Sequence, residues 1–186
     1  MFFVILHQNT DNMNYFKFYE LPITFSMDEK DLKKRFLKKS KQFHPDFFTM
    51  ESEEVQAEML ELSTFNTEAY KVLSDENKRI LYILSLKNTI APEGQNQLPP
   101  DFLMEVMDIN EQIMELEFEH TAENYEKVVA EINLFENNLK FEIKDILQRF
   151  DFELVTDSDL DKIKLFYFKS KYLLRMSENV SKFASL

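Results

Sequence analysis

The tripeptide His44-Pro45-Asp46 contains the residues best placed to make a specific polar interaction in this sequence. A proline biases the residue before it away from the helical conformation, so the tripeptide predicts a turn that ends a helix. The fixed φ of the proline also stiffens that turn, and Asp46 therefore loses little entropy on binding. A carboxylate held in this way can form a charge-assisted hydrogen bond with an arginine of a partner protein. The tripeptide therefore indicates a docking point.

A basic segment comes directly before this tripeptide in an otherwise acidic chain. Residues 30–41 hold seven basic residues and one acidic residue, a local charge of +6, whereas the rest of the chain carries −18. Lys30, Lys34, Lys38 and Lys41 recur at helical spacing, so they are expected on one side of a helix. Such a face would steer association with an acidic partner surface, mainly through the on-rate and in a salt-sensitive way. The alternative for each lysine is an ordinary solvated helix face.

Catalytic and cofactor sites are not predicted. The chain has no cysteine, and its three histidines, His7, His44 and His120, show no ligand spacing with one another. One glycine in 186 residues can hardly build a phosphate-binding loop, and no Ser-His-Asp pattern is present. The many carboxylates are expected on exposed helix faces. We therefore expect no enzyme activity, no metal and no cofactor.

Composition favours an all-α protein. One glycine and five prolines provide too few turn residues for a sheet protein, and a hydrophobic fraction of 44% excludes global disorder. A net charge of −12 argues against nucleic-acid binding, and the apolar runs are too short to cross a membrane. The apolar start, residues 1–6, lacks the basic residues of a signal peptide. We expect a cytoplasmic protein. Its recognisable sequence pattern begins near Tyr15, so Met13 is an alternative first residue.

Two helical units are predicted on either side of a linker. The stretch 87–100 holds three prolines, Pro92, Pro99 and Pro100, together with the only glycine, Gly94. The expected order is an N-terminal extension over 1–13, a helical domain over 14–86, the linker over 87–100 and a C-terminal domain over 101–186.

The N-terminal domain is expected to contain an antiparallel helical hairpin. Ser26 and Glu29 have the spacing of a capping box, which predicts a helix start at this point. That helix is expected to bury Leu32, Phe36 and Phe43 and to end before His44. A second long helix is predicted by an apolar stripe over 55–73, and a short third helix is predicted over about 77–86.

The C-terminal domain is predicted to be a three-helix bundle. The first stripe runs over 102–116, the second over 125–150 after a start near Thr121, and the third over about 157–183 after a cap at residues 156–159. Apolar residues recur three and four positions apart in each. The stripe of the first helix comprises Phe102, Val106, Ile109, Ile113 and Leu116.

The first helix of this bundle carries a second apolar stripe. Successive residues turn by about 100°, so Leu103, Met107 and Met114 lie about 120° from the core stripe. Just beyond them, farther from the core, lie Met104, Asp108, Glu111 and Glu115. An apolar strip edged by carboxylates suits a partner with apolar and basic residues. The alternative is that Leu103 and Met107 pack on the N-terminal domain or widen the bundle core.

The N-terminal half resembles the J-domain of DnaJ-class co-chaperones. The resemblance covers residues 14–86 and rests on an aromatic-rich segment at 15–22, the basic helix, the His-Pro-Asp turn and the segment 69–79. In that family these elements bind the ATPase domain of a DnaK-type chaperone and trigger hydrolysis there. One departure is Phe47, where the family usually has Lys or Arg. The resemblance implies chaperone-binding roles for Lys30, Lys34, Lys38, Lys41, His44, Pro45 and Asp46.

The C-terminal half resembles HscB, the J-domain co-chaperone of iron–sulfur cluster assembly, in its bacterial form. The residues that carry this likeness are 98–108, with 62–70 and 83–86 before them and 164–176 in the last helix. HscB proteins bind the cluster scaffold IscU with this domain. At Asn110 many relatives have Arg. The resemblance implies scaffold-binding roles for Leu103, Met104, Met107, Asp108, Glu111, Glu115 and Tyr167.

The hypothesis from sequence is an HscB-like co-chaperone. It would bind IscU with the bundle, bind an HscA- or DnaK-type chaperone with the basic helix and the turn, and stimulate that chaperone's ATPase without hydrolysing ATP itself. Two alternatives remain. One is a general J-domain co-chaperone with another client, and the other is a helical adaptor in which the His-Pro-Asp turn is incidental.

Overall fold

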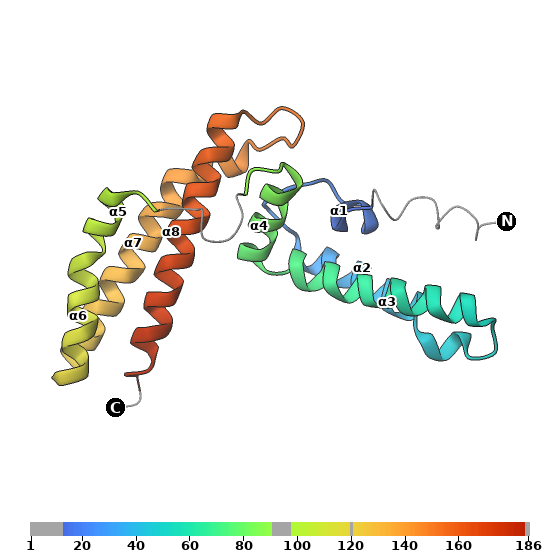
Figure 1. The fold of residues 1–186 in the computed structure, drawn as a ribbon, viewed down its shortest axis with the longest axis horizontal. Helices are drawn as coiled ribbons and strands as arrows, with labels where there is room; N and C mark the ends of the chain where they lie inside the picture. The colour runs from blue at the N-terminus through green and yellow to red at the C-terminus, as the bar shows by residue number, and fades with distance from the viewer. Residues whose placement is uncertain (1–12, 91–97, 120, 185–186) are drawn as a thin grey trace. The chain divides into compact units, whose positions relative to one another are not determined.

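A computed structural model describes residues 13–90, 98–119 and 121–184 of the chain (Figure 1). Every regular element in these ranges is helical, which confirms the prediction of an all-α protein. The chain divides into two compact units between Ile83 and Leu84. Several expectations lie outside the described residues: the extension over 1–12, linker residues Pro92 and Gly94, and two histidines, His7 and His120.

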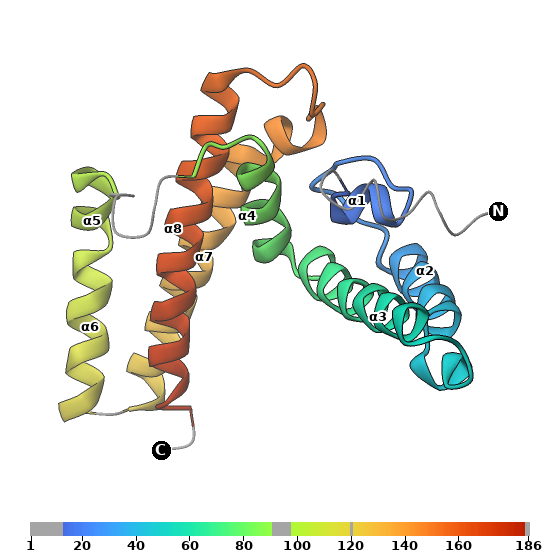
Figure 2. The ribbon, with the colours of Figure 1, turned by 45° about the vertical axis from the view of Figure 1, so that its right-hand side comes forward.

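The N-terminal unit is built on a helical hairpin. Helices α2 (Glu29–Gln42) and α3 (Glu53–Leu73) lie side by side and antiparallel, and the short 3₁₀ helix η3 (Pro45–Phe48) lies in the turn between them (Figure 2). Helix α1 (Tyr15–Phe18) packs on α3, and α4 (Glu76–Leu86) follows the hairpin.

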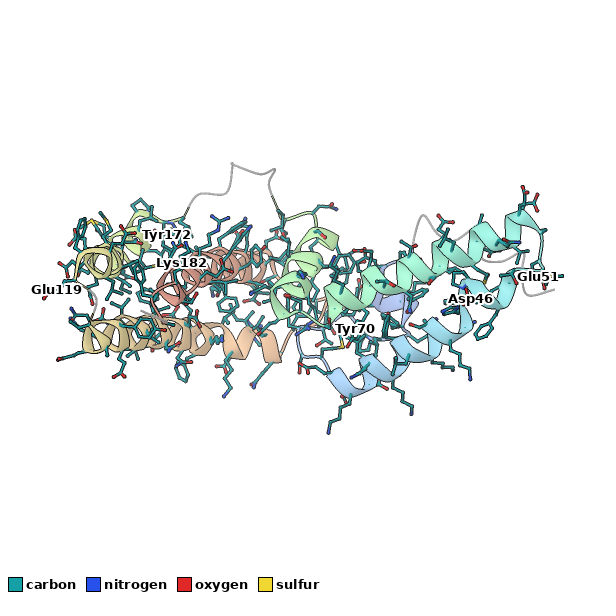
Figure 3. The ribbon with its side chains drawn as sticks, turned by 90° about the horizontal axis from the view of Figure 1, so that it is seen from below. Asp46, Glu51, Tyr70, Glu119, Tyr172 and Lys182 are labelled. Carbon is teal, nitrogen blue, oxygen red and sulfur yellow. The ribbon has the colours of Figure 1, made fainter. Side chains whose placement is uncertain are left out.

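The core of the hairpin forms where the predicted stripes meet. Leu32 on α2 and Leu73 on α3 are fully buried, and Phe36 on α2 stacks on Tyr70 of α3 with ring centroids 4.2 Å apart. Figure 3 shows Tyr70 between the two helices. Apolar burial of this kind contributes about 25 cal/mol per Å² and is the main force that holds the hairpin closed.

The start of α2 differs from the predicted capping box. The N-cap is Asp28, whose carboxylate accepts hydrogen bonds from the backbone N–H groups of Lys30 and Asp31. Ser26 lies outside the helix, and the carbonyl of the buried residue before it, Phe25, accepts a 3.0 Å hydrogen bond from Nε of Arg79. Ser26 and Asp28 are both good N-cap residues, and the structure uses Asp28.

The C-terminal unit is a helical bundle, as predicted. Helices α6 (Met107–Phe118), α7 (Ala122–Gln148) and α8 (Asp157–Ser181) pack against one another. The predicted first helix is divided into α5 (Pro100–Glu105) and α6, with Val106 between them, and Figure 2 shows the two in succession. Pro100 is the first residue of α5, where its missing N–H leaves no hydrogen bond unmade.

All five residues of the predicted stripe from Phe102 to Leu116 are buried. Thr156 caps α8 as expected, accepting a hydrogen bond from the N–H of Asp159. The carboxylate of Asp159 is buried. Both of its oxygens accept a hydrogen bond from Nη2 of Arg149, at 2.8 and 2.9 Å. This ion pair fixes the end of α7 against the start of α8.

Candidate functional site

The His44-Pro45-Asp46 turn is open to solvent. His44 is the N-cap of η3, and its Nδ1 accepts a 3.3 Å hydrogen bond from the backbone N–H of Asp46. Pro45 occupies the first position of η3, which sets the backbone of the turn. The side chain of Asp46 is 83% exposed, and Figure 3 places it where α2 and α3 are joined. The carboxylate lies 3.7 Å from Nδ1 of His44 and is otherwise open to a cation from a partner.

The predicted lysine face is exposed along α2. Lys30, Lys34, Lys38 and Lys41 all lie on the surface. Lys39 differs, because its ammonium sits 4.3 Å from the centroid of the Phe18 ring, and burial lowers the pKa of that group. Lys39 therefore covers the core of its own unit, whereas the four lysines of the predicted face are exposed.

A buried polar network holds the hairpin at a fixed separation. The hydroxyl of Tyr19 lies 2.8 Å from both the backbone carbonyl and the side-chain Oδ1 of Asn66 on α3. The amide nitrogen of Asn66 donates to Oγ of Ser40 at 2.9 Å and to the carbonyl of Phe36 at 3.3 Å, both on α2. Burial raises the pKa of Tyr19, so the hydroxyl stays protonated and able to donate. Through these bonds the core fixes the relative position of the lysine face and the turn.

Phe47 gives the turn an aromatic residue on its surface. It is exposed, and its ring centroid lies 5.6 Å from that of His44. The resemblance to the J-domain indicated only that a positive charge, usual in the family at this position, is absent here. The structure adds that an exposed apolar ring lies in the same turn as the carboxylate of Asp46.

The second predicted strip is also exposed. Leu103 is 42% exposed and Met107 is 54% exposed, and both lie outside the buried core of the bundle. The alternative that they widen the bundle core is therefore wrong. Met104, Asp108, Glu111, Met114 and Glu115 are exposed with them.

Two further residues that the sequence singled out, Tyr167 and Asn110, have surroundings that the sequence did not reveal. Tyr167 is only 6% exposed and packs edge-on against Phe168, with ring centroids 5.2 Å apart. It offers a partner little surface, so its contact role stays a prediction that the packing does not favour. Asn110 donates a 3.0 Å hydrogen bond to the hydroxyl of Tyr172 on α8. The neutral residue at position 110 thus connects α6 to α8 through this hydrogen bond.

Sequence reasoning missed Phe118, the last residue of α6, which is exposed. It lies four positions after Met114, so helical spacing could have included it in the strip.

Among the described residues, no group of three or more His, Asp and Glu side chains is arranged to hold a metal ion. None of the described helices is long and apolar enough to span a bilayer.

Both halves of the chain match known protein families. Residues 15–82 match the family described as the DnaJ domain, and residues 98–181 match the one described as the HSCB C-terminal oligomerisation domain.

Individual relatives agree with these matches. A co-chaperone protein HscB homolog of Haemophilus ducreyi is 28% identical over 84% of this chain and 90% of its own length. A homolog of the same name from Vibrio cholerae is 36% identical over 54% of this chain, a segment that spans 60% of the relative. The crystal structure of human co-chaperone protein HscB has the same fold, with a TM-score of 0.76 at 22% identity over 91% of this chain and 81% of that one.

Proposed function

The chain belongs to the HscB family of co-chaperones, and from that premise we propose that it links an iron–sulfur scaffold to a chaperone. The bundle would bind the scaffold IscU, and the hairpin would bind an HscA- or DnaK-type chaperone and stimulate its ATPase. The protein would act in the cytoplasm and assist the assembly or transfer of iron–sulfur clusters.

The observation that carries the chaperone half of this proposal is the solvent-exposed Asp46 beside a face of lysines. An exposed carboxylate next to unpaired lysines does not contribute much to folding, since surface ion pairs are worth only about 0–1 kcal/mol. It is well suited to an interface in which an arginine of the chaperone meets Asp46 and acidic residues meet the lysines. ATP hydrolysis would take place in the chaperone.

The scaffold half rests on the exposed strip of α5 and α6. Its apolar centre can bury methionine and leucine side chains against a partner, and its carboxylates select a partner with basic flanks. The residues proposed to make this contact are Leu103, Met104, Met107, Asp108, Glu111 and Glu115.

Two sites on one chain have a physical advantage over two separate proteins. A scaffold held by the bundle is kept close to any chaperone bound by the hairpin, so its effective concentration there rises to the millimolar range for a short connection. The proposed result is efficient transfer without a strong direct affinity between scaffold and chaperone.

The test is a pair of assays on full-length variants. Asp46→Asn is expected to remove stimulation of the chaperone ATPase and to bind scaffold normally. The double variant Leu103→Ala, Met107→Ala is expected to show the reverse. Equal ATPase stimulation by wild type and Asp46→Asn would exclude the chaperone mechanism. Normal stimulation with no scaffold binding by wild type would indicate a general co-chaperone with another client.

A further inference from the structure

The apolar strip continues along α6 past the residues assigned to scaffold binding above. Met114 is 61% exposed and Phe118 is 88% exposed. At about 100° per residue, Met107, Met114 and Phe118 fall within about 40° of one another around the helix. From Leu103 to Phe118 the strip is about 22 Å long, at about 1.5 Å per residue. Glu119, the next residue, is labelled at this end of α6 in Figure 3.

The charge around the strip has a single sign. No lysine or arginine occurs between Lys87 and Lys127, whereas nine carboxylates occur between Asp101 and Glu126. A surface of this kind repels acidic partners, which disfavours a second copy of this −12 chain everywhere except at its lysine face on α2. It attracts a partner with an apolar centre and basic flanks, and the face of an aromatic ring such as Phe118 can also contact a cation.

A second exposed apolar pair in the same bundle serves as a comparison for Met114 and Phe118. Leu134 and Phe141 on α7 are 62% and 79% exposed, close to the values for Met114 and Phe118. They lie among residues of both signs, with Lys140 and Lys144 close in sequence. Scattered apolar residues are ordinary on protein surfaces. The α6 pair differs because it extends an existing strip and shares its acidic edge.

We propose that the scaffold-binding surface extends to the C-terminal end of α6, where Met114 and Phe118 form a second apolar contact with the iron–sulfur scaffold. This inference rests on the proposed function and specifies how the partner is recognised. The scaffold would need an apolar surface about 22 Å long with basic residues along it, since both ends of the strip are engaged. The polar residues Asn110 and Glu111 lie between Met107 and Met114 along the helix. The proposed contact therefore has two apolar centres, one around Met107 and one at Met114 and Phe118.

The test measures the affinity of full-length variants for purified scaffold by calorimetry. The variant Met114→Ser, Phe118→Ser is expected to weaken binding about tenfold, as is typical when an exposed aromatic anchor of an interface is lost. The matched control Leu134→Ser, Phe141→Ser is expected to stay within about twofold of wild type. The conservative variant Met114→Leu, Phe118→Tyr is expected to retain affinity within a similar range, because it keeps the apolar contact. All these side chains are exposed, so the fold is expected to survive, and circular dichroism checks this.

Distinct results separate this inference from the proposed function. If the Met114→Ser, Phe118→Ser variant binds like wild type while Leu103→Ala, Met107→Ala does not, the function stands and the extension is wrong. If both serine pairs weaken binding equally, the effect is not specific to α6 and the extension is again wrong. Loss of self-association with unchanged scaffold affinity, measured by sedimentation, would also overturn it. If wild type binds no scaffold, both proposals fail.

Discussion

The lysine face of α2 and the acidic strip of α5 and α6 are built by the same means with opposite signs. α2 buries a core stripe and carries mostly basic residues on its solvent side, and α5 and α6 bury a core stripe and carry only acidic residues among their charged side chains. They differ in what accompanies the charge. At the hairpin turn the exposed carboxylate of Asp46 follows the lysine face along the chain and shares the turn with the exposed ring of Phe47, whereas on the bundle a row of apolar side chains lies among the carboxylates. The hairpin is therefore suited to a polar, geometrically specific contact, and the bundle is suited to burial of apolar surface.

This difference should also appear in binding thermodynamics. Contacts made by exposed charges act mainly on the association rate and weaken as salt is added. Contacts that bury apolar groups act mainly on the dissociation rate and produce a negative heat-capacity change. The two surfaces can therefore be distinguished by measurement as well as by mutation.

The largest expected effect comes from reversing the charge of each surface. Lys34→Glu with Lys38→Glu should slow association with the chaperone by about tenfold or more at low salt, because attraction becomes repulsion. Glu111→Lys with Glu115→Lys should weaken scaffold binding for the same reason. Stopped-flow association at several salt concentrations measures both. Each double variant should leave the other partner unaffected, and a change in both partners would contradict the assignment of separate surfaces.

A core substitution tests whether each of the two units is stabilised by its own core, independently of the other unit. Asn66→Ala would leave the buried hydroxyl of Tyr19 and the carbonyl of Phe36 without a bond that they now make. The substitution removes the three hydrogen bonds of the Asn66 side chain, while the backbone carbonyl of residue 66 still accepts a bond from Tyr19. A hydrogen bond contributes about 0.5–1.5 kcal/mol net, so the N-terminal unit should lose about 2 kcal/mol of unfolding free energy. Hydrogen exchange resolved by residue measures this loss.

The control for this variant is scaffold binding, which depends on the other unit. It should be unchanged, while ATPase stimulation should fall as the hairpin becomes less stable. Equal loss of protection in α7 and α8 would show that the units do not unfold separately.

The smallest expected effect is that of Phe47→Lys. The substitution adds a positive charge at an exposed position next to Asp46 in the sequence, and it removes an exposed ring. Association with an acidic chaperone surface should become about two- to threefold faster at low salt, and the gain should disappear at high salt. A large loss of ATPase stimulation would instead show that the ring itself contacts the chaperone.

Sequence predicted the helices well wherever the signal was local. The Thr156 cap, the end of α2 before His44 and the stripe from Phe102 to Leu116 all follow from neighbouring residues. The start of α2 did not, because Ser26 and Asp28 are both good N-cap residues and the local pattern does not choose between them. The break at Val106 leaves the apolar periodicity unchanged, so the pattern could not reveal it.

The candidate site was predictable to a similar extent. Leu103 and Met107 lie on the solvent side as helical spacing indicated, and Asp46 is exposed in the turn that Pro45 predicted. The orientation of Tyr167 was not predictable, because Phe166 and Phe168 flank it and three adjacent aromatic residues give no periodic contrast.

The most direct test asks whether the two surfaces must be on the same chain. Scaffold-dependent stimulation of the chaperone ATPase is measured with wild type and with an equimolar mixture of two full-length variants, Asp46→Asn and Leu103→Ala, Met107→Ala. The account predicts that the mixture falls far short of wild type, because neither chain in it can hold both partners. A mixture as active as wild type would contradict the claim that this protein works by joining a scaffold to a chaperone.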